Sequence, residues 1–140
     1  MKSPSRPEAS MGPKYLAIAS LLGMVVGGIA PAPLRAAAPR LTVYFASDFT
    51  DAAYQKKTYQ KVAAAWKRPA NTPKPGSKAV VIAVIQKDGS VPAPTLSHTS
   101  GSDEWDAAAL AAVNHAAPLD PLPKAYRRPS VEVHFHFEYV

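Results

Sequence analysis

An Asp-Gly turn between two extended runs constrains the fold of this chain more than any other feature. Residues 79–85 form an unbroken apolar run, and an extended pattern resumes at residues 91–96 after the loop 86–90. Gly89 can adopt the positive φ that a tight turn demands, so this pattern predicts a β-hairpin. The hairpin is expected to be structural, and its turn is not interpreted as a site.

The second strand of this hairpin contains two prolines. Pro92 and Pro94 stand two residues apart, so their missing N–H groups fall on the same side of the strand. A strand with this defect cannot pair on that side, and it is therefore predicted to lie at a sheet edge.

Residues 131–140 show the clearest strand pattern in the chain, with strict alternation and no proline or glycine. One predicted face holds Val131, Val133, Phe135, Phe137 and Tyr139, and the other holds Glu132, His134, His136 and Glu138. Such a period of two is typical of a sheet with one wet side.

Two helices are predicted, one before the hairpin and one after it. Residues 51–67 carry an apolar stripe, with candidate N-caps just before it, and Pro69 ends the pattern. The stripe consists of Tyr59, Val62, Ala63 and Trp66, and the candidate caps are Ser47, Asp48 and Thr50. Residues 103–116 are alanine-rich, follow a cap at Ser102 or Asp103, and present the stripe Trp105, Ala109, Ala112 and Val113.

These elements predict an α+β domain over residues 50–140, with two helices packed on one face of a three-stranded antiparallel sheet. The last strand is expected to pair with the first, which gives the order second, first, third. One free edge then carries the two prolines, and the other is the regular strand 131–140.

The N-terminal residues resemble an export signal more than a part of the domain. Residues 1–38 comprise a weakly basic segment, an apolar stretch at 15–30 and a small-residue region, the layout of a secretory signal peptide. The apolar stretch is shorter than the roughly 20 residues of a spanning helix, which favours cleavage over a membrane anchor. Residues 39–49 are expected to act as a linker, in which the alternation of Leu41, Val43 and Phe45 could form a short strand.

Composition excludes several classes of function. The chain of 140 residues has no cysteine, so it has no disulfide, thiolate metal site or cysteine nucleophile. The net charge is +6, but residues 1–38 contribute four basic residues against Glu8, or +3, and leave only +3 for the rest. Since these charges do not gather in one run, nucleic-acid binding is not expected.

Two groups of residues are candidates for metal binding or catalysis, and neither interpretation is preferred. His134 and His136 could ligate one metal, but the neighbouring strand offers only apolar residues as a third ligand. A hydrolytic triad could be drawn from Ser97, His98, Ser100 and either Asp103 or Asp106. A helix cap explains these turn residues better. We therefore expect no enzyme activity, metal or cofactor.

The order of these elements resembles the C-terminal domain of the TonB/TolA family. The resemblance covers about residues 50–140 and is carried by five segments: YQKVAAAWKRP (59–69), VVIAVIQKDGSV (80–91), TSGSDEWDAAALAAV (99–113), APLDPLP (117–123) and VEVHFHFEYV (131–140). Thr99 and Trp105 stand where the family usually has serine and leucine.

The resemblance implies a periplasmic domain that recognises an envelope protein or peptide, of the outer-membrane-receptor type, by strand addition. The implied partner-binding residues are Val131, Glu132, Val133, His134, Phe135, His136, Phe137 and Glu138. An alternative is an assembly module that forms a homodimer through the same edge. Contact with the inner membrane is expected only if residues 15–30 remain as an anchor.

The resemblance departs where the family couples to energy. Members that transduce proton-motive force have a histidine in the N-terminal helix and a long spacer, whereas the apolar stretch here has no histidine and is followed by a short tether. On the outer face, Val80, Ile82 and Val84 replace residues that are often polar in the family, which suggests a covered surface.

Overall fold

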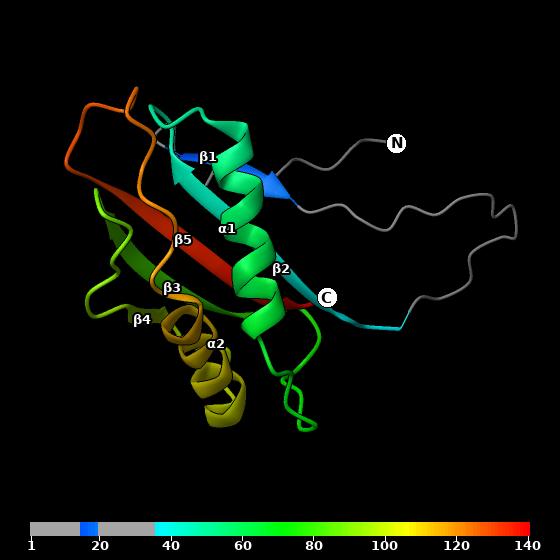
Figure 1. Cartoon of the computed structure of the whole chain (residues 1–140). Coiled ribbons are helices and arrows are strands. Elements are labelled where there is room, and N and C mark those ends of the chain that lie inside the picture. The colour runs from blue at the N-terminus through cyan, green and yellow to red at the C-terminus, as the bar shows by residue number, and fades with distance from the viewer. Residues whose placement is uncertain (1–14, 20–35) are drawn as a thin grey trace, which may run out of the picture.

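The computed structural model describes residues 15–19 and 36–140. Its elements are β1 (Tyr15–Ala19), β2 (Pro39–Ala46), α1 (Ala52–Ala65), β3 (Ser77–Gln86), β4 (Thr95–His98), α2 (Asp103–Ala116) and β5 (Ser130–Tyr139). The strands form one antiparallel sheet in the order β1-β2-β5-β3-β4 (Figure 1). Four of them, β2 to β5, lie within residues 36–140.

The α+β class with two helices is confirmed, but the sheet is wider than predicted. The expected order of three strands is present as β4-β3-β5. Beyond β5, however, β2 pairs in register from Pro39↔Tyr139 to Phe45↔Val133. The prediction that strand 131–140 forms a free edge is therefore wrong, and residues 39–46, expected within a linker, are part of the sheet.

Both helices lie on the same face of the sheet, and the core fills the space between these two layers (Figure 1). The alternating residues of β2, β3 and β5 that face the helices are buried, as their periodicity predicts. The largest fully buried side chains are Trp105, Phe45, Phe49, Phe135, Phe137 and Ile85, followed by several valines.

The two helix predictions differ in accuracy. In α2, Ser102 is the N-cap and the predicted stripe of Trp105 and three small residues is buried. In α1, the cap is Asp51, whose Oδ1 accepts from Tyr54 N at 2.9 Å. The buried residues within α1 are Tyr54, Gln55, Thr58 and Val62, which form a face rotated from the predicted stripe. Of that stripe, Val62 and Trp66 are buried, and Tyr59 and Ala63 are partly buried against the core.

The hairpin begins with the predicted turn but pairs later than expected. Gln86 N donates to Ser90 O at 2.9 Å, and Gly89 has φ +93°. The second strand, β4, starts only at Thr95, after both prolines, and pairs from Ile82↔Thr95 to Val80↔His98. Because β4 has no second strand partner in the described sheet, its predicted edge position is confirmed.

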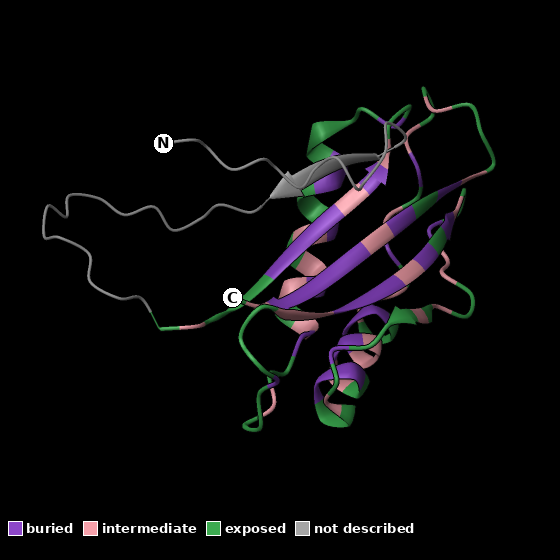
Figure 2. Ribbon diagram, turned by 180° about the vertical axis from the view of Figure 1, so that it is seen from behind, coloured by how far each residue is buried: buried purple, intermediate pink, exposed green. Residues whose placement is uncertain are grey.

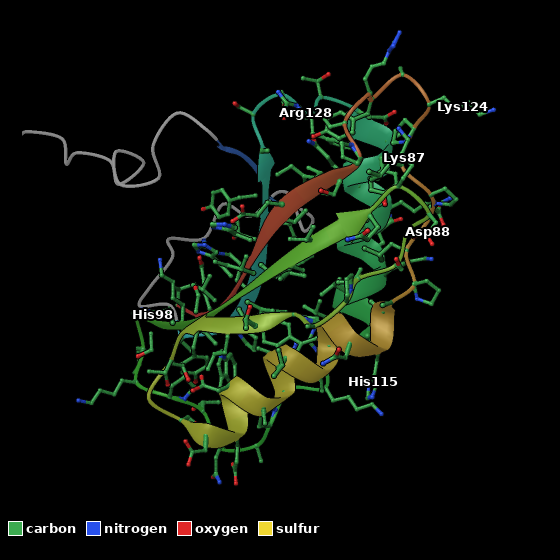
Figure 3. The ribbon with its side chains drawn as sticks, turned by 90° about the vertical axis from the view of Figure 1, so that its left-hand side faces the viewer. Lys87, Asp88, His98, His115, Lys124 and Arg128 are labelled. Atoms are coloured by element: carbon green, nitrogen blue, oxygen red, sulfur yellow. The ribbon has the colours of Figure 1, made fainter. Side chains whose placement is uncertain are left out.

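The turn also anchors the long connection to β5. Leu119 N donates to Gly89 O at 2.8 Å, and Leu122 N donates to Lys87 O at 3.0 Å. The Lys87 ammonium donates to Tyr126 O at 3.0 Å. Figure 3 shows Lys87 and Asp88 at this end of the sheet and His98 far from them, at the end of β4. The turn is thus a structural junction.

The expected signal peptide falls mainly on residues 1–14 and 20–35, which lie outside the described residues. Of its described residues, 15–19 form β1 and 36–38 precede β2. Among the described residues, no helix is both long enough and apolar enough to span a bilayer.

Candidate functional site

The face of the sheet opposite the helices, called here the outer face, is seen from its open side in Figure 2, where no described helix lies in front of the strands. Three cross-strand rows from β2, β5 and β3 form its centre: Arg40, Glu138 and Lys78; Thr42, His136 and Val80; Tyr44, His134 and Ile82. The predicted register of β3, with Val80 and Ile82 facing outward, is confirmed.

His136 occupies the middle of the outer face and is only 5 % exposed. The ring of Tyr44 lies over it, with 4.6 Å between centroids, and its Nδ1 has no hydrogen-bond partner among the described residues. Burial, helped by Lys78, His134 and His98, lowers the pKa of His136 to about 4. His136 is therefore neutral at pH 7 and acts as an aromatic part of the surface.

A partly buried ion pair borders this histidine. Arg40 donates from Nε and Nη2 to Glu138 Oε1, at 2.9 and 2.6 Å, and Glu138 is only 8 % exposed. Burial, with a contribution from Glu138, raises the pKa of Tyr44. The pair thus fixes one end of the outer face and links β2 to β5.

The rest of the outer face is more open. His134 Nε2 lies 2.9 Å from Glu132 Oε2, at half-buried and exposed positions respectively. Val80 is buried, Ile82 is half-buried and Val84 is exposed. No three histidine or acidic side chains of the described residues gather as a metal site. The arrangement suits contact with another surface better than ligation.

The predicted partner-binding residues divide between the two faces of β5. Glu132, His134, His136 and Glu138 lie on the outer face, whereas Val131, Val133, Phe135 and Phe137 are buried under the helices. Since β2 and β3 pair with β5 on its two sides, its backbone is used within the sheet. Strand addition directly to residues 131–138 would require the removal of β2.

The strand beyond β5 on this side of the sheet is β2, whose place in the sheet sequence reasoning missed. A five-residue segment, β1, pairs with it from Tyr15↔Ala46 to Ala19↔Thr42. At the opposite edge, β4 has only four residues and follows Pro92 and Pro94. The signal for β2 was the alternation of Leu41, Val43 and Phe45, which indicates a strand but not its place in the sheet.

Two residues of the candidate triad, Ser100 and Asp106, form a hydrogen-bond network at the start of α2, whereas Ser97 and His98 lie in β4. Asp106 is buried and its Oδ1 accepts from Ser100 N at 2.8 Å and from Ser100 Oγ at 2.7 Å. Its Oδ2 accepts from the Thr99 hydroxyl. The Ser100 hydroxyl and the Asp106 carboxylate are thus engaged in positioning the start of α2.

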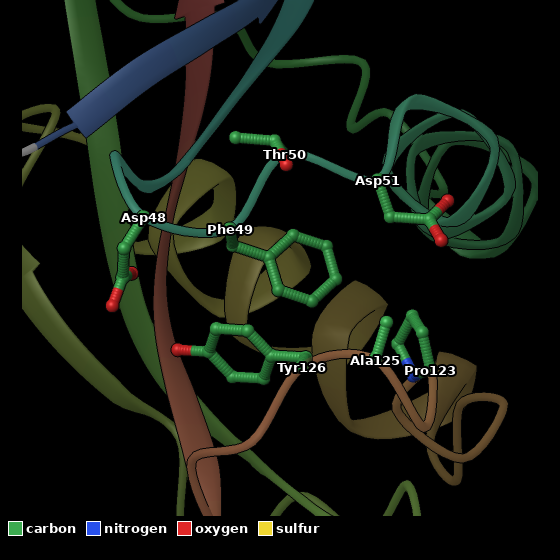
Figure 4. Close-up of a pocket in the computed structure, with 7 residues that line it drawn as sticks. All are labelled: Asp48, Phe49, Thr50, Asp51, Pro123, Ala125 and Tyr126. Carbon is green, nitrogen blue, oxygen red and sulfur yellow. The ribbon is translucent and has the colours of Figure 1, made fainter.

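A cleft of about 210 Å³ lies where the segment between β2 and α1 meets residues 123–126 (Figure 4). Phe49 and Tyr126 form its walls, with ring centroids 4.9 Å apart. Its carboxylates already have partners, because Asp48 accepts from Arg128 Nε at 2.6 Å and Asp51 caps α1. The cleft is therefore a weaker candidate than the β2 edge.

One comparison with known proteins identifies a family to which the chain is similar. A family model described as TonB C terminal matches residues 51–137. No curated protein and no solved structure matches the chain.

Proposed function

Because the chain belongs to the TonB C-terminal family, we propose that it is an exported domain of the cell envelope that binds an extended segment of a partner protein. The partner is of the outer-membrane-receptor type, as the resemblance implies. The role is binding and not catalysis, since the polar residues of the α2 turn serve as a cap.

The observation that carries this proposal is the pairing of β1 with β2. A segment from outside the matched domain adds to the sheet over five residues in regular antiparallel register. An edge that accepts one extended segment offers the same N–H and C=O groups to another. The β2 edge, and not residues 131–138, is thus the proposed acceptor.

The outer face can add specificity to this contact. Thr42 and Tyr44 lie on β2 and also on the outer face. There Thr42 is next to His136, and Tyr44 is next to His134. A partner strand beside β2 therefore places alternate side chains next to this aromatic and polar patch. Main-chain hydrogen bonds supply affinity in such complexes, and alternate side chains supply selectivity.

The segment between the apolar stretch and β2 is short, which limits how far a membrane-anchored form could extend from the inner membrane. If residues 15–30 remain in the inner membrane, residues 31–38 precede β2 and span at most about 30 Å. Such a form would act near the inner membrane. We therefore propose that any energy-coupled role involves a partner that extends close to the inner membrane.

Site-specific photo-crosslinking in cells tests the binding role. A photoreactive amino acid at Thr42 or Tyr44 is expected to capture an envelope protein, whereas one at Ser97, on the opposite edge, is not. Mass spectrometry then identifies the captured protein and its crosslinked segment. Equal capture from both edges, or capture from neither, would contradict the proposal.

A homodimer through the β2 edge, in place of β1, is the second candidate, and it would use the same backbone N–H and C=O groups of β2. Two copies related by a two-fold axis can pair their β2 strands antiparallel. Concentration-dependent sedimentation distinguishes this candidate, because it predicts a dimer without any partner. A crosslink between two copies of the chain at Tyr44 would support it.

A further inference from the structure

We propose that residues Tyr15–Ala19 act as an internal strand that closes the β2 edge until export withdraws them. This inference rests on the proposed function, because it concerns the same edge. It adds that the unexported chain is closed to partners and that the exported chain is open.

The argument begins with an incompatibility between two uses of the same residues. Tyr15–Ala19 form β1 in the sheet, yet they open the apolar stretch 15–30 that is expected to enter the membrane or to be cleaved. A residue inside a bilayer or removed by a peptidase cannot pair with β2. Export and closure of the edge therefore exclude each other.

Without β1, the outer edge of β2 would be exposed before export. Leu41, Val43 and Phe45 are buried at this side of the sheet, and β2 presents eight residues of backbone. A long regular edge is a template for unwanted pairing. The opposite edge is protected differently, by the shortness of β4 and by the prolines before it.

The strength of this closure follows from the connection between the strands. Residues 20–38 join β1 to β2, so the pairing of β1 with this edge is intramolecular, unlike that of a separate peptide. A separate peptide at micromolar concentration competes poorly with it. Loss of β1 should strengthen peptide binding by about ten- to a hundredfold.

The edge also defines the chemistry of its occupant. A strand in the β1 position runs antiparallel to β2, and two of its alternate residues lie opposite Val43 and Phe45, which belong to the core-facing side of β2. Those two positions favour apolar side chains. The residues opposite Thr42 and Tyr44 can be polar. The occupant is thus an extended segment without internal proline.

A disulfide tests whether β1 closes the edge in the full chain. The chain has no native cysteine, so Ala17→Cys with Tyr44→Cys creates one pair at register partners. The purified full chain, in mild detergent, should form this disulfide on oxidation. A matched pair, Ala17→Cys with Ile82→Cys, should not form it, because β2 and β5 both lie between β1 and β3. Failure of the first pair would overturn the closure.

A peptide tests whether removal of β1 opens the edge. The probe is a fluorescent synthetic peptide with the sequence of residues 14–20, and the variant is full-length Ala17→Pro/Ile18→Pro, which cannot maintain the β1 ladder. The variant should bind the probe at least about tenfold more tightly than the unchanged chain. Ala36→Pro, outside the strands, is the control and should resemble the unchanged chain.

Either equal binding by the variant and the unchanged chain, or no binding by both, would overturn the inference. The oxidised Ala17→Cys/Tyr44→Cys variant adds a reversible check, because it should bind the probe only after its disulfide is reduced. Neither experiment uses an envelope partner. A failure of the proposed function would appear in the crosslinking experiment, and a failure of closure would appear here.

Discussion

The indole Nε1 of Trp105 donates to the backbone carbonyl of Phe137 at 2.9 Å, inside the core. Trp105 is fully buried, and its ring meets Trp66 edge to face with 5.4 Å between centroids. This hydrogen bond joins α2 to β5, the strand at the centre of the sheet. The indole therefore contributes a hydrogen bond to the backbone in addition to its apolar contacts.

Trp105→Phe should destabilise the domain by about 1–2 kcal/mol more than Trp66→Phe. Both changes replace a buried indole with a smaller ring, but Trp66 Nε1 has no hydrogen-bond partner among the described residues. Only the first change removes a buried hydrogen bond between side chain and backbone. Chemical denaturation followed by circular dichroism measures both; equal losses would show that the hydrogen bond contributes little.

Gly89→Ala should be strongly destabilising, by roughly 2–4 kcal/mol. A Cβ at Gly89 would clash with the backbone oxygen of Leu119, and the residue also has φ +93°. Gly76→Ala is the matched control, since Gly76 has φ +94° but open space around it. The control should cost only about 1 kcal/mol. Thermal melts of the two variants separate the steric contact from the backbone conformation.

The stability of the domain should fall as the pH decreases from about 6.5 to 4, because His136 resists protonation in the folded state. An unfolded histidine binds a proton near pH 6.5, whereas the folded pKa is about 4. The unfolded state therefore binds more protons in this window, and acid favours unfolding. The loss should be on the order of 2 kcal/mol at pH 4.

His136→Leu should remove most of this pH dependence, and His115→Gln, at an exposed position of α2, should leave it unchanged. The other charged or titratable groups around His136 are Tyr44, Lys78, His98, His134 and Glu138, and they remain in both variants. Urea denaturation at several pH values provides the measurement. An unchanged slope in His136→Leu would assign the acid sensitivity to those neighbours.

Asp106→Asn should destabilise the start of α2 by about 2–3 kcal/mol. The carboxylate accepts from Ser100 N and Ser100 Oγ, and an amide keeps only one oxygen acceptor while adding two donors to a buried site. Asp103→Asn, an exposed change in the same helical turn, is the control and should cost less than about 0.5 kcal/mol. Hydrogen exchange of the α2 amides should reveal faster local opening only in the first variant.

Periodicity predicted the faces of most elements correctly. The alternation in β5 and the stripe of α2 placed their apolar residues in the core, because a buried face leaves a local repeat in the sequence. The rotation of α1 was not predicted, since Gln55 and Thr58 are polar residues at buried positions. Gln55 Nε2 donates to Phe49 O at 3.0 Å, and Thr58 Oγ1 donates to Tyr54 O at 2.9 Å, which compensates their burial.

The position of β2 in the sheet could not be predicted from local sequence patterns. Leu41, Val43 and Phe45 indicated a strand, but strand order depends on contacts with β5, which lies far along the chain. The burial of His136 has the same origin. Its neighbours Thr42, Tyr44 and Val80 come from two other strands, so the sequence around His136 carried no sign that a polar position would be desolvated.

The two edges of the sheet differ in a way that limits how copies of this domain can assemble. Within the described sheet, β4 at one edge has only four residues and follows Pro92 and Pro94, whereas the β2 side accepts a further strand, β1. A unit with a single extensible side can form a closed pair, after which no growing end remains. Open-ended fibrils need two such sides. The short β4 and the prolines before it should therefore oppose the growth of open-ended fibrils, even when the β2 edge is uncovered.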